Sequence, residues 1–337
     1  MVLTLLTLVT LVAAVSGPGK EIRFAVPQSW PKPKYDFKNN RLSLEGFELG
    51  RALFYDPLLS SDSSISCASC HLSFTAFTHA DHKLSHGIEG LRGTRNSPVL
   101  INLAWNTSFM WDGGVNNLEV QAINPLTSPV EMNSKLPELI AKLSRSVKYR
   151  KLFFKAFGDS LITTQKLLKS LAQFTGNLVS CNSKYDSVMR REPGVRFSDR
   201  ELEGYKIFKS NCETCHKEPL FTNFAFENIG LAGDSILKDT GRMKITNNPE
   251  DSLKFKVPTL RNIEYSAPYF HDGRVNKLKE VIDHYTSGIV QSPTLAKQLE
   301  RKIILSGEQK KDLVAFLKTL TDKSFLYNMQ FRQAISF

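Results

Sequence analysis

Two short segments of the chain place cysteine and histidine in the same order, as two Cys-x-x-Cys-His motifs at residues 67–71 and 212–216. Two thiols three positions apart can both bond the vinyl groups of one porphyrin, and the adjacent imidazole can then bind its iron. Structural zinc sites space their ligands differently, and dithiol redox pairs do not require the histidine. The sequence therefore predicts two covalently attached c-type haems. The predicted haem-binding residues are Cys67, Cys70, His71, Cys212, Cys215 and His216, with His71 and His216 as ligands of the two irons.

An internal repeat surrounds the two motifs. Residues 98–120 match residues 258–280 without gaps at an offset of 160, and both copies contain an Asp-Gly turn. Each copy is therefore expected to contain a helix, the haem motif, a loop, the Asp-Gly turn and a second helix. Shorter matches pair residues 74–77 with 221–224, and residues 50–54 with 204–208.

These elements predict a mainly α-helical fold of two cytochrome-c-like haem domains related by duplication, with long loops and little strand. The expected N-terminal domain covers residues 40–190 and the expected C-terminal domain residues 197–325, joined by a linker at residues 190–196. The chain has 337 residues, 41% of them hydrophobic, which is enough for two cores. Cys181, outside the haem motifs, is predicted to be a buried structural thiol, with redox chemistry as the alternative.

The start of the chain predicts export. Residues 1–16 carry no charged side chain and end in Ala14-Val15-Ser16, a plausible cleavage site. We expect a signal peptide (residues 1–16) and a periplasmic protein. The alternative is an uncleaved anchor, which is the one expected route to membrane contact.

The formal net charge of +11 predicts a basic surface, which suits an acidic protein partner. The lysines and arginines are scattered, and no basic run is interleaved with aromatic residues. Nucleic acid is therefore not an expected partner, and a generally solvated surface is the alternative interpretation.

The two copies differ at one position that bears on chemistry. Tyr285 in the second copy stands where the first copy has Pro125. A tyrosine oxygen can bind haem iron, whereas proline cannot. If this position faces the distal side of each haem, the first iron is open to a reactant and the second is occupied. Alternatively, Tyr285 is an aromatic residue that packs its helix.

From about Leu44 to about Leu320, the chain resembles the bacterial di-haem cytochrome c peroxidase and MauG superfamily. The resemblance implies that hydrogen peroxide reacts at the N-terminal haem on His71, and that the C-terminal haem on His216 passes electrons. This division agrees with the difference between Pro125 and Tyr285. Besides the haem motifs, the matching segments are residues 93–98, 109–113, 129–132, 257–262 and 267–273.

The resemblance also assigns catalytic roles. The family's distal glutamine and glutamate fall on Gln121 and Glu131, and its tryptophan between the haems falls on Trp111. A carboxylate at Glu131 can take a proton from the near oxygen of peroxide and return it to the far oxygen as water leaves. Gln121 would orient the peroxide. The alternatives are a surface acid for Glu131 and core packing for Trp111.

Further matches concern a calcium ion and a haem propionate. Asn96, Ser266 and Pro268 match the family's interdomain calcium ligands, the latter two through backbone carbonyls, in line with calcium's preference for oxygen. Serine replaces the usual threonine, which a backbone ligand tolerates. His271 matches a histidine near the second haem, where a propionate contact is expected rather than iron ligation.

Two departures distinguish this chain within the superfamily. Ordinary cytochrome c peroxidases place a methionine on the relay haem, and the matching residue here is Tyr285, as in MauG-like members. His284 is the alternative ligand, but helical neighbours point about 100° apart, so only one of the two can serve.

The second departure lies in the loop after His71. The classical peroxidases carry a resting-state distal histidine there, whereas this chain has Ile88 at the matching position and His86 two residues earlier. His79, His82 and His86 are therefore expected to be loop residues, which leaves the peroxidatic haem open at rest. Ligation by His86 remains the alternative.

The sequence thus predicts a peroxidase that takes electrons from a small redox protein such as cytochrome c or a cupredoxin. The first alternative is a MauG-like enzyme that uses peroxide-derived high-valent haems to oxidise side chains of a partner protein. The second is an electron-transfer cytochrome without catalysis. A homodimer is left open.

Overall fold

The computed structural model describes residues 19–233 and 236–333, so the predicted signal peptide lies outside the described residues. The described chain is mostly helical, and its one sheet consists of two antiparallel strands. The prediction of a mainly α fold with little strand is confirmed. The α-helices are α1 (Leu44–Phe54), α2 (Cys67–Cys70), α3 (Ile123–Thr127), α4 (Leu136–Arg145), α5 (Val147–Phe157), α6 (Thr164–Gly176), α7 (Lys184–Met189), α8 (Asp199–Asn211), α9 (Met243–Thr246), α10 (Leu278–Asp283), α11 (Lys297–Glu300), α12 (Gly307–Lys318) and α13 (Lys323–Leu326). The strands are β1 (Phe226–Glu227) and β2 (Phe255–Lys256), and a π-helix (His284–Gly288) continues α10.

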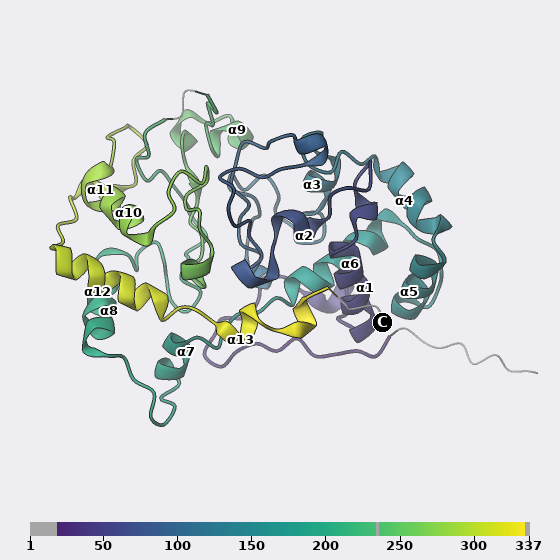
Figure 1. Cartoon of the computed structure of the whole chain (residues 1–337), viewed down its shortest axis with the longest axis horizontal. Coiled ribbons are helices and arrows are strands. Elements are labelled where there is room, and N and C mark those ends of the chain that lie inside the picture. Colours follow the sequence, from purple (N-terminus) through teal and green to yellow (C-terminus); the bar gives the residue numbers. More distant parts are fainter. Residues whose placement is uncertain (1–18, 234–235, 334–337) are drawn as a thin grey trace, which may run out of the picture.

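The chain forms two lobes side by side (Figure 1). One buried apolar cluster is built mainly on α1, α5 and α6, and a second on α8, α10 and α12. The end of the chain crosses back, because Phe325, Leu326 and Phe331 pack in the first cluster. The C-terminal segment therefore belongs to the core of the N-terminal lobe, although the expected boundary of the second domain was residue 325.

Serine caps start the long helices of both lobes. The Ser43 hydroxyl accepts the Gly46 N–H at 3.0 Å at the start of α1. Ser198 and Ser306 begin α8 and α12, and each forms a reciprocal capping box with the residue three positions later. Such caps satisfy N–H groups that have no partner within the helix.

Each lobe contains one close helix crossing with a glycine at the contact. A side chain at Gly50 in α1 would place its Cβ 2.0 Å from the Ser170 carbonyl oxygen of α6. A side chain at Gly204 in α8 would place its Cβ 1.9 Å from the Asp312 carbonyl oxygen of α12. These two glycines occupy equivalent positions of the sequence repeat, so both lobes use the same device to bring two helices together.

The repeat is also visible in the backbone. Asn102 and Asn262 are both left-handed, with φ of 56° and 60°. The Phe109 N–H donates to the carbonyl six residues later at 2.7 Å, and the Tyr269 N–H makes the same bond at 2.6 Å. The two Asp-Gly turns therefore have the same conformation, as expected from the offset of 160.

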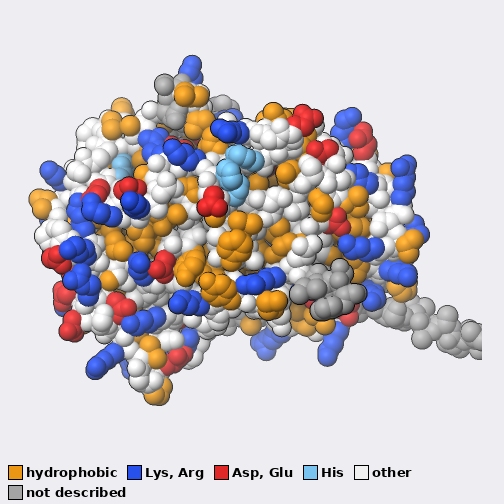
Figure 2. Space-filling view, viewed as in Figure 1, with side chains coloured by type: hydrophobic (Ala, Val, Ile, Leu, Met, Phe, Trp, Pro, Cys, Tyr) orange, Lys and Arg blue, Asp and Glu red, His pale blue; other side chains and the backbone are white. Residues whose placement is uncertain are grey.

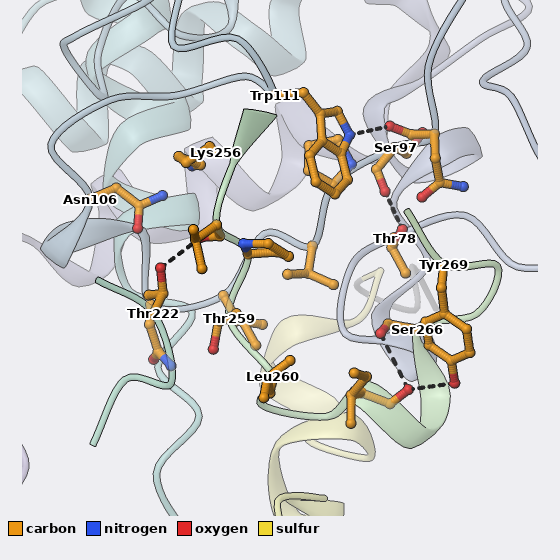
Figure 3. A pocket seen from close by; sticks show the side chains of 18 of the residues that line it. Thr78, Ser97, Asn106, Trp111, Thr222, Lys256, Thr259, Leu260, Ser266 and Tyr269 are labelled. Carbon is orange, nitrogen blue, oxygen red and sulfur yellow. Dashed lines mark hydrogen bonds between the residues drawn. The ribbon is translucent and has the colours of Figure 1, made fainter. Parts of the chain in front are cut away.

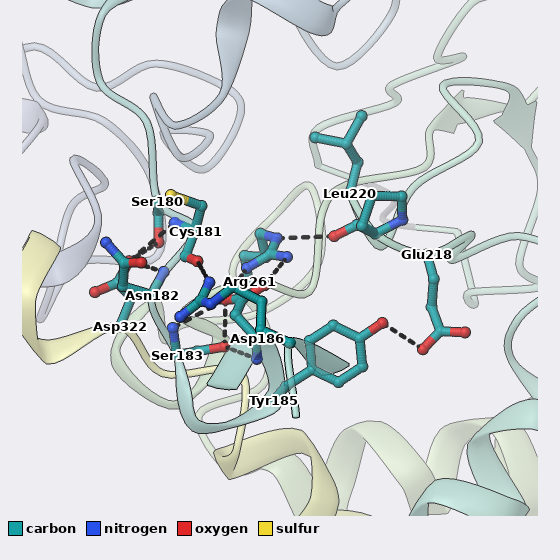
Figure 4. A network of polar contacts seen from close by, with 12 residues as sticks. Ser180, Cys181, Asn182, Ser183, Tyr185, Asp186, Glu218, Leu220, Arg261 and Asp322 are labelled. Atoms are coloured by element: carbon teal, nitrogen blue, oxygen red, sulfur yellow. Dashed lines mark hydrogen bonds and ion pairs between the residues drawn. The ribbon is translucent and has the colours of Figure 1, made fainter. Parts of the chain in front are cut away.

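A buried polar network holds the segment that joins the lobes (Figure 4). The Asp322 carboxylate accepts hydrogen bonds from the Ser180 hydroxyl at 3.1 Å and from the N–H groups of the next two residues at 3.0 and 2.9 Å. Arg261 is buried and forms a bidentate pair with Asp186, both bonds measuring 2.8 Å. Cys181 is half-buried, not buried as predicted, because the network binds its backbone N–H and not its thiol.

An ion pair ties the first lobe directly to the second. The Arg95 guanidinium donates to both carboxylate oxygens of Asp239 at 2.6 and 2.8 Å, and to Asp112 of its own lobe at 2.5 Å. Burial alone would raise the pKa of Asp239, but the hydrogen bonds and charge of Arg95 outweigh it and lower that pKa. Because both side chains are largely buried, removing one partner leaves a buried charge unpaired and costs more than breaking an exposed pair.

Among residues 19–233 and 236–333, no helix combines the length and the apolar character that a membrane span requires.

The close helix crossings predict an asymmetry between two glycine substitutions. Gly204→Ala should lower the free energy of unfolding by about 1–3 kcal/mol, because the helices must separate to admit the methyl group. The matched control is Gly307→Ala in α12, where an added Cβ meets nothing within 4 Å. Urea unfolding of both holoprotein variants measures the difference, and equal midpoints would contradict the proposed contact.

The pair between Arg95 and Asp239 predicts a pH-dependent stability. Asp239→Asn should cost about 2 kcal/mol at neutral pH, because the buried guanidinium loses a charged acceptor while Asp112 remains. The depressed pKa of Asp239 stabilises the fold above the unfolded-state pKa of about 4, and this contribution is lost as pH falls through the folded-state value. The difference in urea midpoint between Asp239→Asn and the wild type should therefore disappear at acid pH. A constant difference at all pH values would contradict this origin.

Candidate haem sites and the residues between them

The first haem motif lines a cavity of about 580 Å³ in the N-terminal lobe. Helix α2 carries Cys67 and Cys70, and His71 follows directly. The His71 Nδ1 bonds the Phe77 carbonyl oxygen at 2.7 Å, which leaves Nε2 as the nitrogen available to a metal. Burial lowers the pKa of His71 to about 4, so the imidazole is neutral near pH 7. A neutral imidazole beside two thiols on one cavity wall fits a c-type haem.

The second motif has the same arrangement in the C-terminal lobe, beside a cavity of about 190 Å³. Cys212 is the C-terminal cap of α8, and the residues that follow it form turns. The His216 Nδ1 lies 3.2 Å from the Phe221 carbonyl oxygen and 3.1 Å from that of Pro258. Burial lowers the pKa of His216 to about 4. This site also fits a c-type haem, in a smaller cavity.

Pro125 and Tyr285 each line the cavity of their own lobe. Tyr285 lies in the π-helix, and burial raises the pKa of its phenol, with the neighbouring Cys212 and Cys215 adding to the shift. His284 is directed elsewhere, because its Nε2 bonds the Ile229 carbonyl oxygen at 2.8 Å. Of the two ligand candidates for the second iron, Tyr285 is therefore the one placed in the cavity.

Gln121 and Glu131 both line the first cavity. Burial raises the pKa of Glu131, so this carboxyl group holds its proton more readily than an exposed one. The Glu131 carbonyl accepts the Ile88 N–H at 2.8 Å, and Ile88 is buried. His86 lines the cavity as well, so the structure leaves its ligation of the first iron open.

Trp111 borders both haem cavities and a third, small cavity between the lobes (Figure 3). Its indole N–H donates to the Asn96 carbonyl oxygen at 2.8 Å, and its own carbonyl accepts the Lys256 N–H at 2.7 Å. The ring is thus held by segments from both lobes. This is the position expected for a tryptophan between two haems.

The three residues predicted to bind calcium, Asn96, Ser266 and Pro268, all line the third cavity, which measures about 110 Å³. The Asn96 side-chain amide donates to the Lys83 carbonyl oxygen at 3.1 Å, which directs its nitrogen away from any cation and leaves its oxygen as the donor. Lys256 lies on the opposite side of the cavity from Ser266 (Figure 3). The available donors are oxygens of the type that calcium prefers.

His271 lines the second cavity and stacks on Phe255, with ring centroids 3.6 Å apart. Burial lowers the pKa of His271 to about 4. Its carbonyl oxygen accepts the Asn96 N–H at 2.7 Å. The backbone of Asn96 therefore connects Trp111 to the wall of the second cavity.

The sequence reasoning missed two residues of the first cavity. Lys244 and Ile245 lie on α9, which belongs to the second copy of the repeat, yet both line the cavity of the N-terminal lobe. A signal was present, because the offset between copies grows from 147 at Phe77 to 160 at Pro98. Between Phe224 and Pro258 the second copy is thus thirteen residues longer than the first, and α9 lies in this lengthened stretch.

Comparison with known proteins agrees with this geometry. A family described as di-haem cytochrome c peroxidase matches residues 44–193. The methylamine utilization protein MauG of Methylophilus methylotrophus is 35% identical over 310 residues, covering 88% of each chain. The cytochrome c551 peroxidase of Nitrosomonas europaea is 37% identical over 279 residues, covering 81% of this chain and 79% of that protein. A crystal structure of a MauG-like protein associated with microbial copper homeostasis superposes with a TM-score of 0.81 at 31% identity, covering 93% of this chain and 99% of the other.

Proposed function

The chain belongs to the di-haem cytochrome c peroxidase family, and we infer that its two haem cavities divide the reduction of hydrogen peroxide between them. The protein is an oxidoreductase with two c-type haems that uses peroxide. The observation that carries the division of labour is the asymmetry of the cavities. The first is lined by Pro125 and Glu131, whereas the second is lined by the buried Tyr285.

Cys67, Cys70 and His71 would hold the first haem, which would supply the redox chemistry for peroxide. The overall reaction consumes one peroxide, two electrons and two protons and releases two waters. Glu131, as a carboxylate, takes the proton from the near oxygen and returns it to the far oxygen, so that the leaving group departs as water. Gln121 orients the peroxide by hydrogen bonding. Pro125 offers no ligand atom and keeps the coordination position open.

Electrons pass from the second site to the first by way of Trp111. Its contact with both cavities supports this role, since no other aromatic side chain of the described residues lines both. Tyr285 would hold the second haem iron through its phenol oxygen, which would prevent peroxide from reacting there. His271, stacked on Phe255 in the wall of the second cavity, holds a propionate in position.

The remaining assignments rest on the residues around the two sites. Calcium binds Asn96, Ser266 and Pro268 and fixes the junction of the lobes. The electron donor is a small acidic redox protein, a cytochrome c or a cupredoxin, which suits the net charge of +11. The protein acts in the periplasm after loss of residues 1–16. Its oligomeric state, monomer or homodimer, affects none of these roles.

A second function is favoured by one residue. Tyr285 stands where peroxidases of this family use methionine, and MauG of Methylophilus methylotrophus is 35% identical to this chain. In this alternative the oxidising equivalents taken from peroxide are used to oxidise side chains of a partner protein. The electrons then come from that partner and not from a donor cytochrome. A cytochrome without catalysis is disfavoured, because the first cavity is lined by the carboxyl group of Glu131 and by Pro125, which offers no ligand atom.

Glu131 provides the test of the peroxidase mechanism. Glu131→Gln should lower kcat for peroxide by about 10²–10⁴-fold, because the amide cannot accept the proton. In the wild type, activity should fall as pH drops through the raised pKa of Glu131, and this acid limb should be missing from the variant. Steady-state oxidation of a reduced c-type cytochrome measures both effects. Glu138→Gln, an exposed glutamate on α4, is the control, and equal activity of the two variants would rule out the assignment.

Tyr285 separates the two functions. Tyr285→Met should raise the reduction potential of the second haem and change its low-spin ferric spectrum, because a thioether favours reduced iron. His284→Gln should leave both properties as in the wild type. If the enzyme is a donor-dependent peroxidase, Tyr285→Met should retain cytochrome oxidation. If it modifies a protein, that variant should lose the modification. Unchanged spectra and potential in Tyr285→Met would show that this tyrosine does not bind iron.

A further inference from the structure

Three of the seven histidines lie within eight residues of one loop and belong to neither haem motif. The ring centroids of His79 and His82 are 4.7 Å apart, those of His82 and His86 are 4.4 Å apart, and those of His79 and His86 are 6.1 Å apart. Figure 2 shows histidine side chains gathered in one patch on the drawn face. We propose that His79, His82 and His86 form a binding site for one divalent transition-metal ion, separate from the two haem irons.

His79 is the fixed member of the site. His79 is only 8% exposed, and its Nδ1 atom is buried without a hydrogen-bond partner. A buried polar atom left without a partner costs about 1–3 kcal/mol, and such atoms are rare unless an ion or ligand meets them. The preceding residue is held firmly, because the Thr78 carbonyl accepts bonds from the Leu72 N–H at 3.0 Å and the Thr75 hydroxyl at 2.7 Å. The His79 ring thus offers a nitrogen at a defined position.

His82 and His86 are the adjustable members. His82 is exposed and His86 is half-exposed, so both rings can rotate at little cost. The backbone around His86 is nevertheless fixed, because the Gly87 N–H bonds the Leu91 carbonyl at 2.8 Å and the Ile88 N–H bonds the Glu131 carbonyl at 2.8 Å. The loop therefore keeps three imidazoles together while leaving two of them free to reorient.

The distances between the three ring centroids are compatible with one shared ion, although the rings are not arranged around a common position. The His79 and His82 rings are stacked at 30°, and among the described residues no group of three His, Cys, Asp or Glu side chains could hold a metal ion in the observed conformation. With metal–nitrogen bonds of about 2.0–2.1 Å, tetrahedral imidazole ligands place their ring centroids about 5 Å apart. The observed 4.4–6.1 Å span this value. Binding therefore requires the His82 and His86 side chains to rotate until their nitrogens and a nitrogen of His79 face one position.

The ligand set identifies the class of metal. Imidazole nitrogens suit Cu²⁺, Zn²⁺ and Ni²⁺, whereas Ca²⁺ and Mg²⁺ prefer oxygen ligands. Asp81 adds negative charge near His79, and Arg92 adds positive charge near His86, so the two largely offset one another. Among divalent first-row metals, Cu²⁺ is expected to bind most tightly. With three protein ligands, a fourth position is left for water.

The site can be tested on the ferric holoprotein with Cu²⁺ and Zn²⁺ as probes. After treatment with a chelator, the wild type should retain one equivalent of Cu²⁺ in the presence of excess glycine, with nitrogen hyperfine structure in its electron paramagnetic resonance spectrum. Zn²⁺ should compete for the same equivalent. His82→Ala and His86→Ala should each weaken binding at least tenfold. Lys83→Ala, in the same loop, is the matched control and should bind as the wild type does.

Three results would overturn the proposal. The first is removal of all Cu²⁺ from the wild type by glycine. The second is equally tight binding in wild type, His82→Ala and His86→Ala. The third is a ferric haem spectrum that changes in His86→Ala before any metal is added, because this would assign His86 to the first iron. Haem absorption of the variants reports folding independently of metal binding, and none of these outcomes depends on peroxidase activity.

Discussion

The structure depends on holding an imidazole rigidly beside a pair of thiols, and it does this twice by bonding the ring to backbone carbonyls. The Nδ1 of His71 and of His216 each meets a backbone carbonyl in the loop that follows, at Phe77 and Phe221. Both of these phenylalanines have left-handed backbones, with φ of 57° and 54°. The loop must turn back to present its carbonyl, and the buried phenylalanine rings hold it there. Burial keeps each imidazole neutral, the form that can bind iron.

Duplication alone would give two sites with the same chemistry. Function therefore depends on the other residues that line the cavity of each histidine. The first cavity is faced by a proline, which cannot bind iron, and by a buried carboxyl group whose pKa is raised. The second is faced by a buried phenol on a π-helix. The extra residue of the π-turn directs Tyr285 into the cavity while His284 bonds the Ile229 carbonyl. Small local differences on a shared scaffold therefore create two sites with different access.

The sequence was sufficient to predict features that neighbouring residues form or that both copies of the repeat share. The haem motifs, the mainly helical fold and the Asp-Gly turns were predicted in this way. The helix crossings at Gly50 and Gly204 were not predicted, although both glycines belong to matched segments. The sequence could not predict contacts that join distant segments without a repeated partner. Ile245 of the second copy reaches the first cavity, and Phe331 returns to the first core, because these placements depend on how the lobes pack. The contact of His79 with His82 and His86 likewise depends on loop backbone that no periodicity describes.

At the junction between the lobes, one short segment joins the lobes and holds the tryptophan that we propose to carry electrons. The carbonyl of Asn96 accepts the Trp111 indole N–H, and its N–H donates to His271 in the wall of the second cavity. Its neighbour Arg95 binds Asp239 across the junction. A shift of the lobes would therefore move Trp111 relative to both haem sites at once. Because electron transfer falls steeply with distance, an oxygen-bound cation at Asn96 would act on the reaction through the position of this tryptophan, without touching peroxide or either iron.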